Sequence, residues 1–187
     1  MRVRPDIPKR QYWMFVTAEA MSRFLPRRLC YWLVLRLADT YYRSDIRGRK
    51  AVRANLRRVT ASLGQTLDDA ALEAMVRRVF QGFSKYLIDF ISFSHLTRAA
   101  ADDLVEIEHP EQLERVKRMG RGALLVTAHL GNWELAGAAL VARGYPITAV
   151  AQRQGQKKLD NLFMSYRRKR GITVLPLSLT VVRQLLE

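Results

Sequence analysis

Apolar and polar positions follow two different rhythms along this chain of 187 residues. Up to about residue 95, apolar residues recur at spacings of three and four, the period of helices that bury one face. From about residue 104 onward, short apolar runs alternate with helical stretches. That alternation is typical of α/β proteins, in which helices cover a parallel sheet. The predicted fold is therefore α/β, a mostly parallel sheet covered by helices, with an N-terminal helical layer.

The N-terminal half predicts a series of helices. Residues 11–42 read as an amphiphilic helical region that Pro26 divides, because proline breaks a helix. "SDIRGRKAVRANLRRVTASLG" predicts a further helix that ends near Gly64. Thr66 with Asp69 resembles a capping box that opens the longest helix. Its predicted core stripe is Leu72, Met75, Val76, Val79, Phe80, Phe83, Leu87, Phe90 and Ile91.

The C-terminal half predicts short strands and the helices between them. "LVEIE" (104–108), "ALLVTA" (123–128), "ITAV" (147–150) and "ITVLPL" (172–177) read as strands. Helices are expected in "PEQLERVKRMG", "NWELAGAALVARG", "KKLDNLFMSYRRKRG" and "TVVRQLLE". The pattern stops inside a helix at Glu187. We therefore expect a single domain over 1–187, incomplete at its C-terminus, with a membrane-facing helical layer at 11–100 and an α/β part at 104–187.

The net charge of the chain indicates which kind of partner it binds. The formal net charge is +15, from 32 Lys and Arg against 17 Asp and Glu, and favours an anionic partner. Aromatic residues interleaved with arginines in residues 11–43 favour a helix lying at a membrane surface, and a core helix pair with a basic outer face is the alternative. The most apolar stretch, "LCYWLVLRLA", is half of the roughly 20 residues that a spanning helix needs. With no signal-peptide pattern, we expect the protein to stay on the side of the membrane where it is made.

The candidate catalytic residues lie where a predicted strand meets a predicted helix, in "GALLVTAHLGNWELAG" at 122–137. His129 stands at the end of a predicted strand, where parallel sheets bind ligands. Asn132 can cap the next helix, and Glu134 lies in that helix's first turn. A carboxylate that accepts a hydrogen bond from one imidazole nitrogen fixes the tautomer of the ring. The other ring nitrogen can then accept a proton. The alternative is a core histidine followed by a glutamate that suits the helix dipole.

The same junction lacks a protein nucleophile. No G-x-S-x-G elbow is present, and the single cysteine, Cys30, lies far away on an aromatic stretch. The nucleophile is therefore expected from a substrate, most simply a hydroxyl. Gly131 lets a carbonyl approach the backbone, and N–H groups at the helix start can hold a developing oxyanion. A hydroxyl and an activated carbonyl together indicate acyl transfer.

The full string "TAHLGNWELAG" resembles the catalytic motif of the lipid A biosynthesis (lauroyl/myristoyl) acyltransferases, within the glycerolipid acyltransferase superfamily. The resemblance implies that His129 is the base and Glu134 its partner, with Gly131 and Asn132 as substrate-binding residues. The segment "AVAQRQGQKKLDNLFMSYRRKRGITVLP" is also similar to the family. Its phosphate-binding arginines would be Arg153 and Arg167, while Gln156 departs from the asparagine common there.

The resemblance also implies partners and location. The donor would be an acyl thioester of acyl-carrier protein or CoA, with no further cofactor and no metal. The acceptor would be a glycolipid hydroxyl, such as a lipid A precursor or, alternatively, a phosphatidylinositol mannoside. The protein would lie at the cytoplasmic face of the bacterial inner membrane, peripheral or weakly anchored to anionic lipid. A truncated, non-catalytic membrane-binding module is the other alternative.

Two other classes fit the residues less well. Nucleic acid is not expected as a partner, because the arginines are spread over every helix and no nucleic-acid-binding motif appears. A metal hydrolase is disfavoured because His95, His109 and His129 lack ligand spacing such as H-E-x-x-H.

Overall fold

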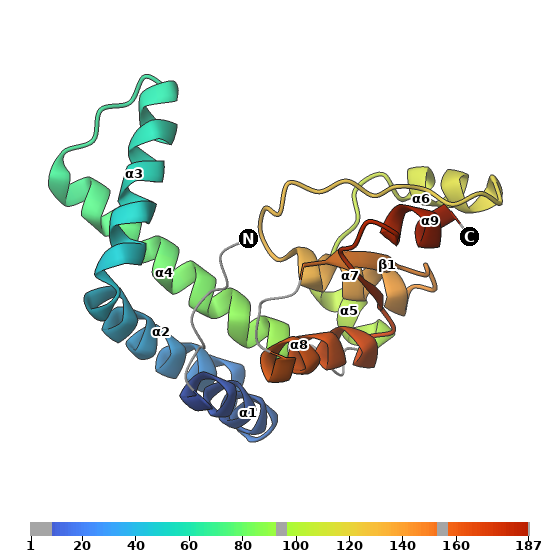
Figure 1. Cartoon of the computed structure of the whole chain (residues 1–187), viewed down its shortest axis with the longest axis horizontal. Coiled ribbons are helices and arrows are strands. Elements are labelled where there is room, and N and C mark those ends of the chain that lie inside the picture. The colour runs from blue at the N-terminus through green and yellow to red at the C-terminus, as the bar shows by residue number, and fades with distance from the viewer. Residues whose placement is uncertain (1–8, 93–96, 153–156, 187) are drawn as a thin grey trace. The chain divides into compact units, whose positions relative to one another are not determined.

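A computed structural model of the protein divides into two compact units (Figure 1). The structure describes residues 9–92, 97–152 and 157–186. The N-terminal unit is Trp13–Ser92, and the described residues from 97 onward belong, together with residues 9–12, to the other unit, which we call the C-terminal unit. Buried apolar side chains occur in both units.

The N-terminal unit is built from helices whose breaks lie where the sequence predicts them. Pro26, which has no main-chain N–H to donate, separates the first two helices. Gly64 follows the third helix with a φ of 68°, a left-handed conformation that glycine adopts without strain. No helix in the described residues is long and apolar enough to cross a membrane. The helices are α1 (Lys9–Phe24), α2 (Arg27–Ser44), α3 (Ile46–Ser62) and α4 (Asp69–Ser92).

Helix α4 supplies much of the core of this unit. It packs against α2 and α3, and the ring of Phe80 lies 5.9 Å from that of Tyr41 and 5.7 Å from that of Tyr42. The predicted stripe is confirmed in the main, but Val79 and Phe83 are exposed. The stripe is wider than the face that α2 and α3 cover. Its buried members are Leu72, Val76, Phe80, Phe90 and Ile91.

The start of α4 differs from the predicted capping box. The side chain of Asp68 accepts a hydrogen bond of 2.6 Å from the N–H of Ala71. Asp68 therefore satisfies one of the free N–H groups of the first turn, the task that the sequence suggested for Thr66. Both residues suit a cap, and only the backbone path decides which one reaches the helix.

The C-terminal unit alternates helices and strands. Two strands pair in parallel, with Thr148 opposite Thr173 and Ala151 opposite Pro176, and a helix crosses between them as parallel strands require. The predicted strands "ITAV" and "ITVLPL" and the predicted helices from Pro110 onward are confirmed. The elements are α5 (Arg98–Leu104), α6 (Pro110–Arg118), α7 (Trp133–Ala142), β1 (Thr148–Ala151), α8 (Lys157–Lys169), β2 (Thr173–Pro176) and α9 (Val181–Leu186).

Two predicted strands are not formed. "LVEIE" begins at the last residue of α5, and "ALLVTA" forms neither a helix nor a paired strand. The side chains of Leu124 and Val126 are 88% and 91% exposed, so the expected burial is also wrong. A strand needs a neighbour for its main-chain hydrogen bonds, and an apolar run cannot supply one. The α/β class is confirmed, but the sheet of the described residues has two strands, and a mostly parallel sheet covered by helices is not established.

Candidate active site

His129 lies in the chain that leads into α7, and its side chain is exposed. Its φ of 54° is left-handed, which is uncommon for a residue with a Cβ. Its N–H donates to the hydroxyl of Thr127 at 3.4 Å, and its ring lies 4.7 Å from the ring of Trp133. The imidazole therefore stands in solvent beside the first residue of α7, where another molecule can reach it.

The turn between His129 and α7 combines a glycine and a cap. Gly131 has a φ of 66°, and an added Cβ there would meet no atom within 4 Å. Its backbone conformation, not crowding, is thus the reason for glycine. The side chain of Asn132 accepts a hydrogen bond of 3.0 Å from the N–H of Leu135 and caps the helix as predicted. Other N–H groups of the first turn have no partner inside the helix and can face a developing negative charge.

Glu134 is 5% exposed and binds arginines. The Nε of Arg167 donates to its two carboxylate oxygens at 3.0 and 3.2 Å, and the Nη2 of Arg167 donates to Oε1 at 2.5 Å. The Nη1 of Arg170 lies 3.7 Å from Oε2. Within the described residues, no hydrogen bond or ion pair joins Glu134 to His129. The carboxylate thus ties the first turn of α7 to the end of α8.

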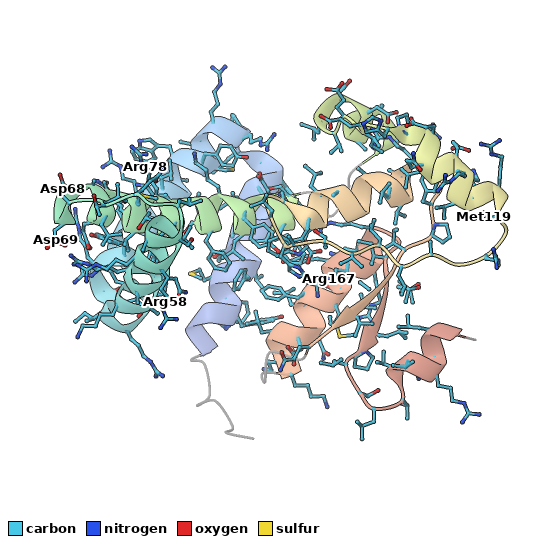
Figure 2. All side chains as sticks on the ribbon, turned by 90° about the horizontal axis from the view of Figure 1, so that it is seen from above. Arg58, Asp68, Asp69, Arg78, Met119 and Arg167 are labelled. Atoms are coloured by element: carbon cyan, nitrogen blue, oxygen red, sulfur yellow. The ribbon has the colours of Figure 1, made fainter. Side chains whose placement is uncertain are left out.

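Arg167 also borders a small cavity, and Figure 2 labels it within the C-terminal unit. The cavity has a volume of about 40 Å³, and Ala151 and Pro176, the last residues of β1 and β2, line it with Arg167 and Phe163. Parallel sheets bind ligands at such carboxyl ends. A cavity of about 10–15 Å³ by this measure holds one water molecule, so this cavity suits a small polar group and not a whole acyl chain.

The structure thus groups the predicted site residues into two sets. His129, Gly131 and Asn132 belong to the exposed turn, while Glu134 and Arg167 form the buried cluster. Arg153, like Gln156, lies outside the described residues. Sequence reasoning missed Arg170, whose signal was its place three residues after Arg167, on the same side of a helical turn.

No group of three or more metal-binding side chains occurs in the described residues. Cys30 is buried in the N-terminal unit.

Comparison with known proteins identifies the family. A family model described as bacterial lipid A biosynthesis acyltransferase matches residues 3–187. A phosphatidylinositol mannoside acyltransferase of Mycolicibacterium smegmatis is 28% identical over 141 residues, which cover 75% of this chain and 45% of the relative. Phosphatidylinositol mannoside acyltransferases of two Mycobacterium tuberculosis strains are 33% identical over 135 residues, 70% of this chain and 41% of theirs. This chain thus spans less than half the length of these relatives, and it belongs to the bacterial lipid A biosynthesis acyltransferase family.

Proposed function

We propose that the protein transfers a fatty acyl chain from an acyl thioester to a hydroxyl group of a glycolipid. The observation that carries the proposal is the exposed imidazole of His129, which stands immediately before the capped N-terminus of α7. A base and a set of N–H donors at one place are what direct acyl transfer requires. Membership of an acyltransferase family supports the reaction class.

In the proposed reaction, His129 takes the proton of the acceptor hydroxyl. The hydroxyl oxygen attacks the carbonyl carbon of the thioester, and the oxyanion that forms lies near the N–H groups of the turn at Gly131 and Asn132. The carbon–sulfur bond then breaks, and the leaving thiolate takes the proton from the imidazolium. Atoms and charge balance with the thioester as the sole co-substrate, so the reaction asks for no cofactor.

Glu134 has an indirect role in this proposal. Its buried carboxylate, held by Arg167 and Arg170, fixes the first turn of α7 and with it the chain that carries His129. The sequence predicted a direct bond between this carboxylate and the imidazole, and the backbone role proposed for Glu134 replaces that bond. Arg167 lines the cavity at the strand ends and is proposed to attract a phosphate of the substrate, a role also proposed for Arg153.

The acceptor follows from the relatives and the family. The mycobacterial relatives are named for phosphatidylinositol mannoside, which is therefore the first acceptor to test. A lipid A precursor is the second, because it gives the family its description. The donor is proposed to be a fatty acyl thioester, carried by either acyl-carrier protein or CoA.

Helices α1 and α2 support a peripheral place on the cytoplasmic face of a bacterial inner membrane. Trp13, Phe24 and Trp32 are each more than half exposed. The guanidinium of Arg36 lies 5.4 Å from the ring centre of Trp32. Exposed rings beside cations suit the depth of lipid headgroups, where each basic residue near anionic lipid is worth about 1 kcal/mol. The same feature favours the second candidate function, a membrane-binding module without catalysis.

A transfer assay with a matched control separates these functions. The protein is given a labelled palmitoyl thioester and vesicles that contain either phosphatidylinositol mannoside or a lipid A precursor. His129→Ala is expected to lower turnover by about 10²- to 10⁴-fold, the usual share of a general base. His109→Ala is the control, because His109 is also exposed, has the same φ of 54° and also precedes a helix.

Each outcome of that assay supports or contradicts one of the two candidate functions. Loss of transfer in His129→Ala alone, with an unchanged melting temperature, supports the proposal. Near-normal transfer by His129→Ala, or an acyl group trapped on a side chain of the protein, contradicts the mechanism. Vesicle binding with no transfer to either acceptor supports the membrane-binding module instead.

A further inference from the structure

A hollow of about 340 Å³ opens between α2 and α4 in the N-terminal unit, and we call it the α2–α4 hollow. Ala70 and Ala74 lie one turn apart on α4 and line it with methyl groups, so their side chains leave the space unfilled. Both alanines are exposed. The volume is at the lower end of the roughly 300–1,000 Å³ typical of small-molecule sites. The hollow is therefore large enough for one small ligand that enters from solvent.

Asp39 and two arginines in the lining place an acceptor beside donors. The carboxylate of Asp39 accepts hydrogen bonds from the Nε and Nη2 of Arg77, at 2.8 and 2.5 Å, and from the Nε2 of Gln81 at 2.8 Å. In the described chain, no hydrogen bond or ion pair uses the Nη1 of Arg77, so its two N–H groups are left for another acceptor. Arg43, also in the lining, is exposed. Two guanidinium groups can thus donate to a ligand held beside Asp39.

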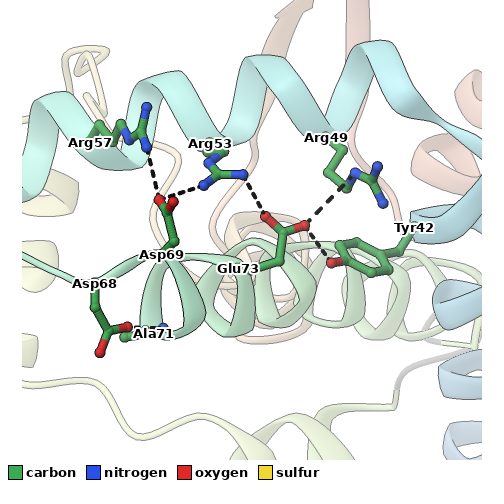
Figure 3. A network of polar contacts seen from close by, with 8 residues as sticks. All are labelled: Tyr42, Arg49, Arg53, Arg57, Asp68, Asp69, Ala71 and Glu73. Carbon is green, nitrogen blue, oxygen red and sulfur yellow. Dashed lines mark hydrogen bonds and ion pairs between the residues drawn. The ribbon is translucent and has the colours of Figure 1, made fainter.

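Tyr42 and Glu73 form a second fixed pair in the lining (Figure 3). The Tyr42 hydroxyl donates to Oε1 of Glu73 at 2.5 Å, and the Nη1 of Arg53 donates to Oε2 at 3.3 Å. Each carboxylate oxygen has a further lone pair, and the phenol oxygen can also accept. These contacts hold the polar groups in place before a ligand arrives, and preorganised groups lose less freedom on binding.

The charges of the lining balance, which favours a neutral ligand. The charged side chains are two carboxylates and two guanidinium groups, those of Asp39, Glu73, Arg43 and Arg77. Hydrogen bonds from Arg77 and Gln81 lower the pKa of the Asp39 carboxyl to about 2, so it is ionised at neutral pH. A phosphate would meet like charge on the carboxylates, and an amine would meet it on the guanidinium groups. A molecule with several hydroxyls meets no like charge, and each hydroxyl can both donate and accept.

We propose that the α2–α4 hollow binds the ring of a neutral polyol, a sugar or a cyclitol. The two carboxylates would accept hydrogen bonds from ring hydroxyls, and Arg43 and Arg77 would donate to others. The methyl groups of Ala70 and Ala74 would face the apolar C–H side of the ring. Such rings occur both in lipid headgroups and free in solution, and only the first source rests on the proposed function.

Two variants and a matched control test the site. Ala74→Leu fills the hollow, keeps every charge and replaces one good helix former by another. Arg43→Gln removes one charged donor at an exposed position. The control is Ala54→Leu, which adds the same side chain to an exposed alanine of α3 outside the lining. Circular-dichroism melts establish that each variant is folded, and if Ala74→Leu does not fold, Arg43→Gln carries the comparison.

The soluble probes are methyl α-mannoside, myo-inositol and inorganic phosphate. Each is titrated into the isotope-labelled protein while the amide resonances are followed by NMR. The membrane probes are phosphatidylcholine vesicles with equal fractions of either phosphatidylinositol or phosphatidylglycerol. These two lipids carry the same charge, but only phosphatidylinositol presents a ring.

Wild type and Ala54→Leu are expected to show saturable shifts with at least one polyol, at amides of α2 and α4 that border the hollow. Ala74→Leu should weaken this binding by about tenfold or more, because its side chain occupies the place of the ring. Arg43→Gln should weaken it by about two- to tenfold, the usual effect of one hydrogen bond. A preference for phosphatidylinositol vesicles that Ala74→Leu removes assigns the ring to a lipid headgroup, and a preference that it leaves unchanged assigns a free polyol.

Three results would overturn the proposal. They are no saturable shift of the wild type with either polyol, equal binding by Ala74→Leu and Ala54→Leu, and phosphate binding at the same amides more tightly than both polyols. None of these readings uses acyl transfer, so they stand or fall apart from the His129→Ala assay.

Discussion

Among the described residues, two clusters of arginines and carboxylates differ in burial, one around Asp69 and one around Glu134. In the N-terminal unit, Asp69 is 78% exposed where Arg53 and Arg57 bind it. In the C-terminal unit, the side chain of Glu134 is 6% exposed and that of Arg170 is 1% exposed. The chemical groups are the same in both places. The difference in burial indicates which of the two clusters contributes more to the stability of the fold.

Water decides the energetic difference between the clusters. A solvated pair gains little, because each charge exchanges water for a partner and side-chain freedom is lost. A buried pair is different, since either charge left alone would stay desolvated. Figure 3 shows the solvated contacts between α3 and α4, which we expect to add little stability. The buried Glu134 cluster, in contrast, holds α7 to the end of α8.

The largest effect is expected from Glu134→Gln. The amide cannot balance the guanidinium groups of Arg167 and Arg170, which stay close together with little solvent. Removing one partner of a buried ion pair typically destabilises by about 3–5 kcal/mol. The free energy of unfolding of the C-terminal unit, measured by urea titration, should fall by that amount. A loss no larger than that of a surface variant would show that water reaches the cluster.

An intermediate effect is expected at Asp39, whose side chain is 17% exposed. Hydrogen bonds from Arg77 and Gln81 lower the pKa of its carboxyl from 3.8 to about 2. A lowered pKa means that the ionised form stabilises the fold. This stability is complete above about pH 4 and is lost as the pH falls from about 4 to about 2.

Asp39→Asn tests this pH dependence. Because Arg77 is half exposed, solvent weakens the interaction, and the variant should lose about 1 kcal/mol of unfolding free energy at pH 7. The difference between wild type and variant should shrink as the pH falls from 4 to 2. Denaturant titrations at several pH values measure it. A difference that stays constant over this range would refute the assignment to Asp39.

The smallest effect is expected from Glu73→Gln in the exposed cluster. Glu73 meets Arg49 and Arg53 and accepts a hydrogen bond from Tyr42, which a glutamine oxygen can also accept. The unfolding free energy should change by less than about 1 kcal/mol, and high salt should remove most of that change. Thermal melts at low and high salt check both points. A salt-independent loss of several kcal/mol would mean that this cluster behaves as a buried one.

Much of the fold could be predicted because the decisive information is local. The stripe of α4, the break at Pro26 and the end of α3 at Gly64 depend on side chains a few residues apart. "ALLVTA" shows the limit of this reasoning. Its apolar letters suit a buried strand, but a strand depends on a partner chain whose identity no local pattern contains.

The candidate site was predictable in part for the same reason. The cap by Asn132 was found correctly, because it joins residues three apart. The arginine partners of Glu134 were not predicted, because Arg167 and Arg170 come 33 and 36 positions later, at the end of α8 and after the strand β1. Because Glu134 follows His129 by only five positions, the sequence favoured His129 as the partner of its carboxylate. The fold brings arginines to the carboxylate instead, and the catalytic role of His129 stays a prediction.

The left-handed backbone of His129 has a consequence for the history of such genes. Asparagine and glycine adopt this conformation more readily than histidine does, so either could replace His129 with little harm to the fold. Glu134 has no such substitutes, since its loss unbalances a buried cluster. After a gene duplication, the copy that drifts would therefore lose the histidine first and keep the glutamate. On the proposed mechanism, a related sequence with Glu134 and without His129 would fold but would not catalyse transfer.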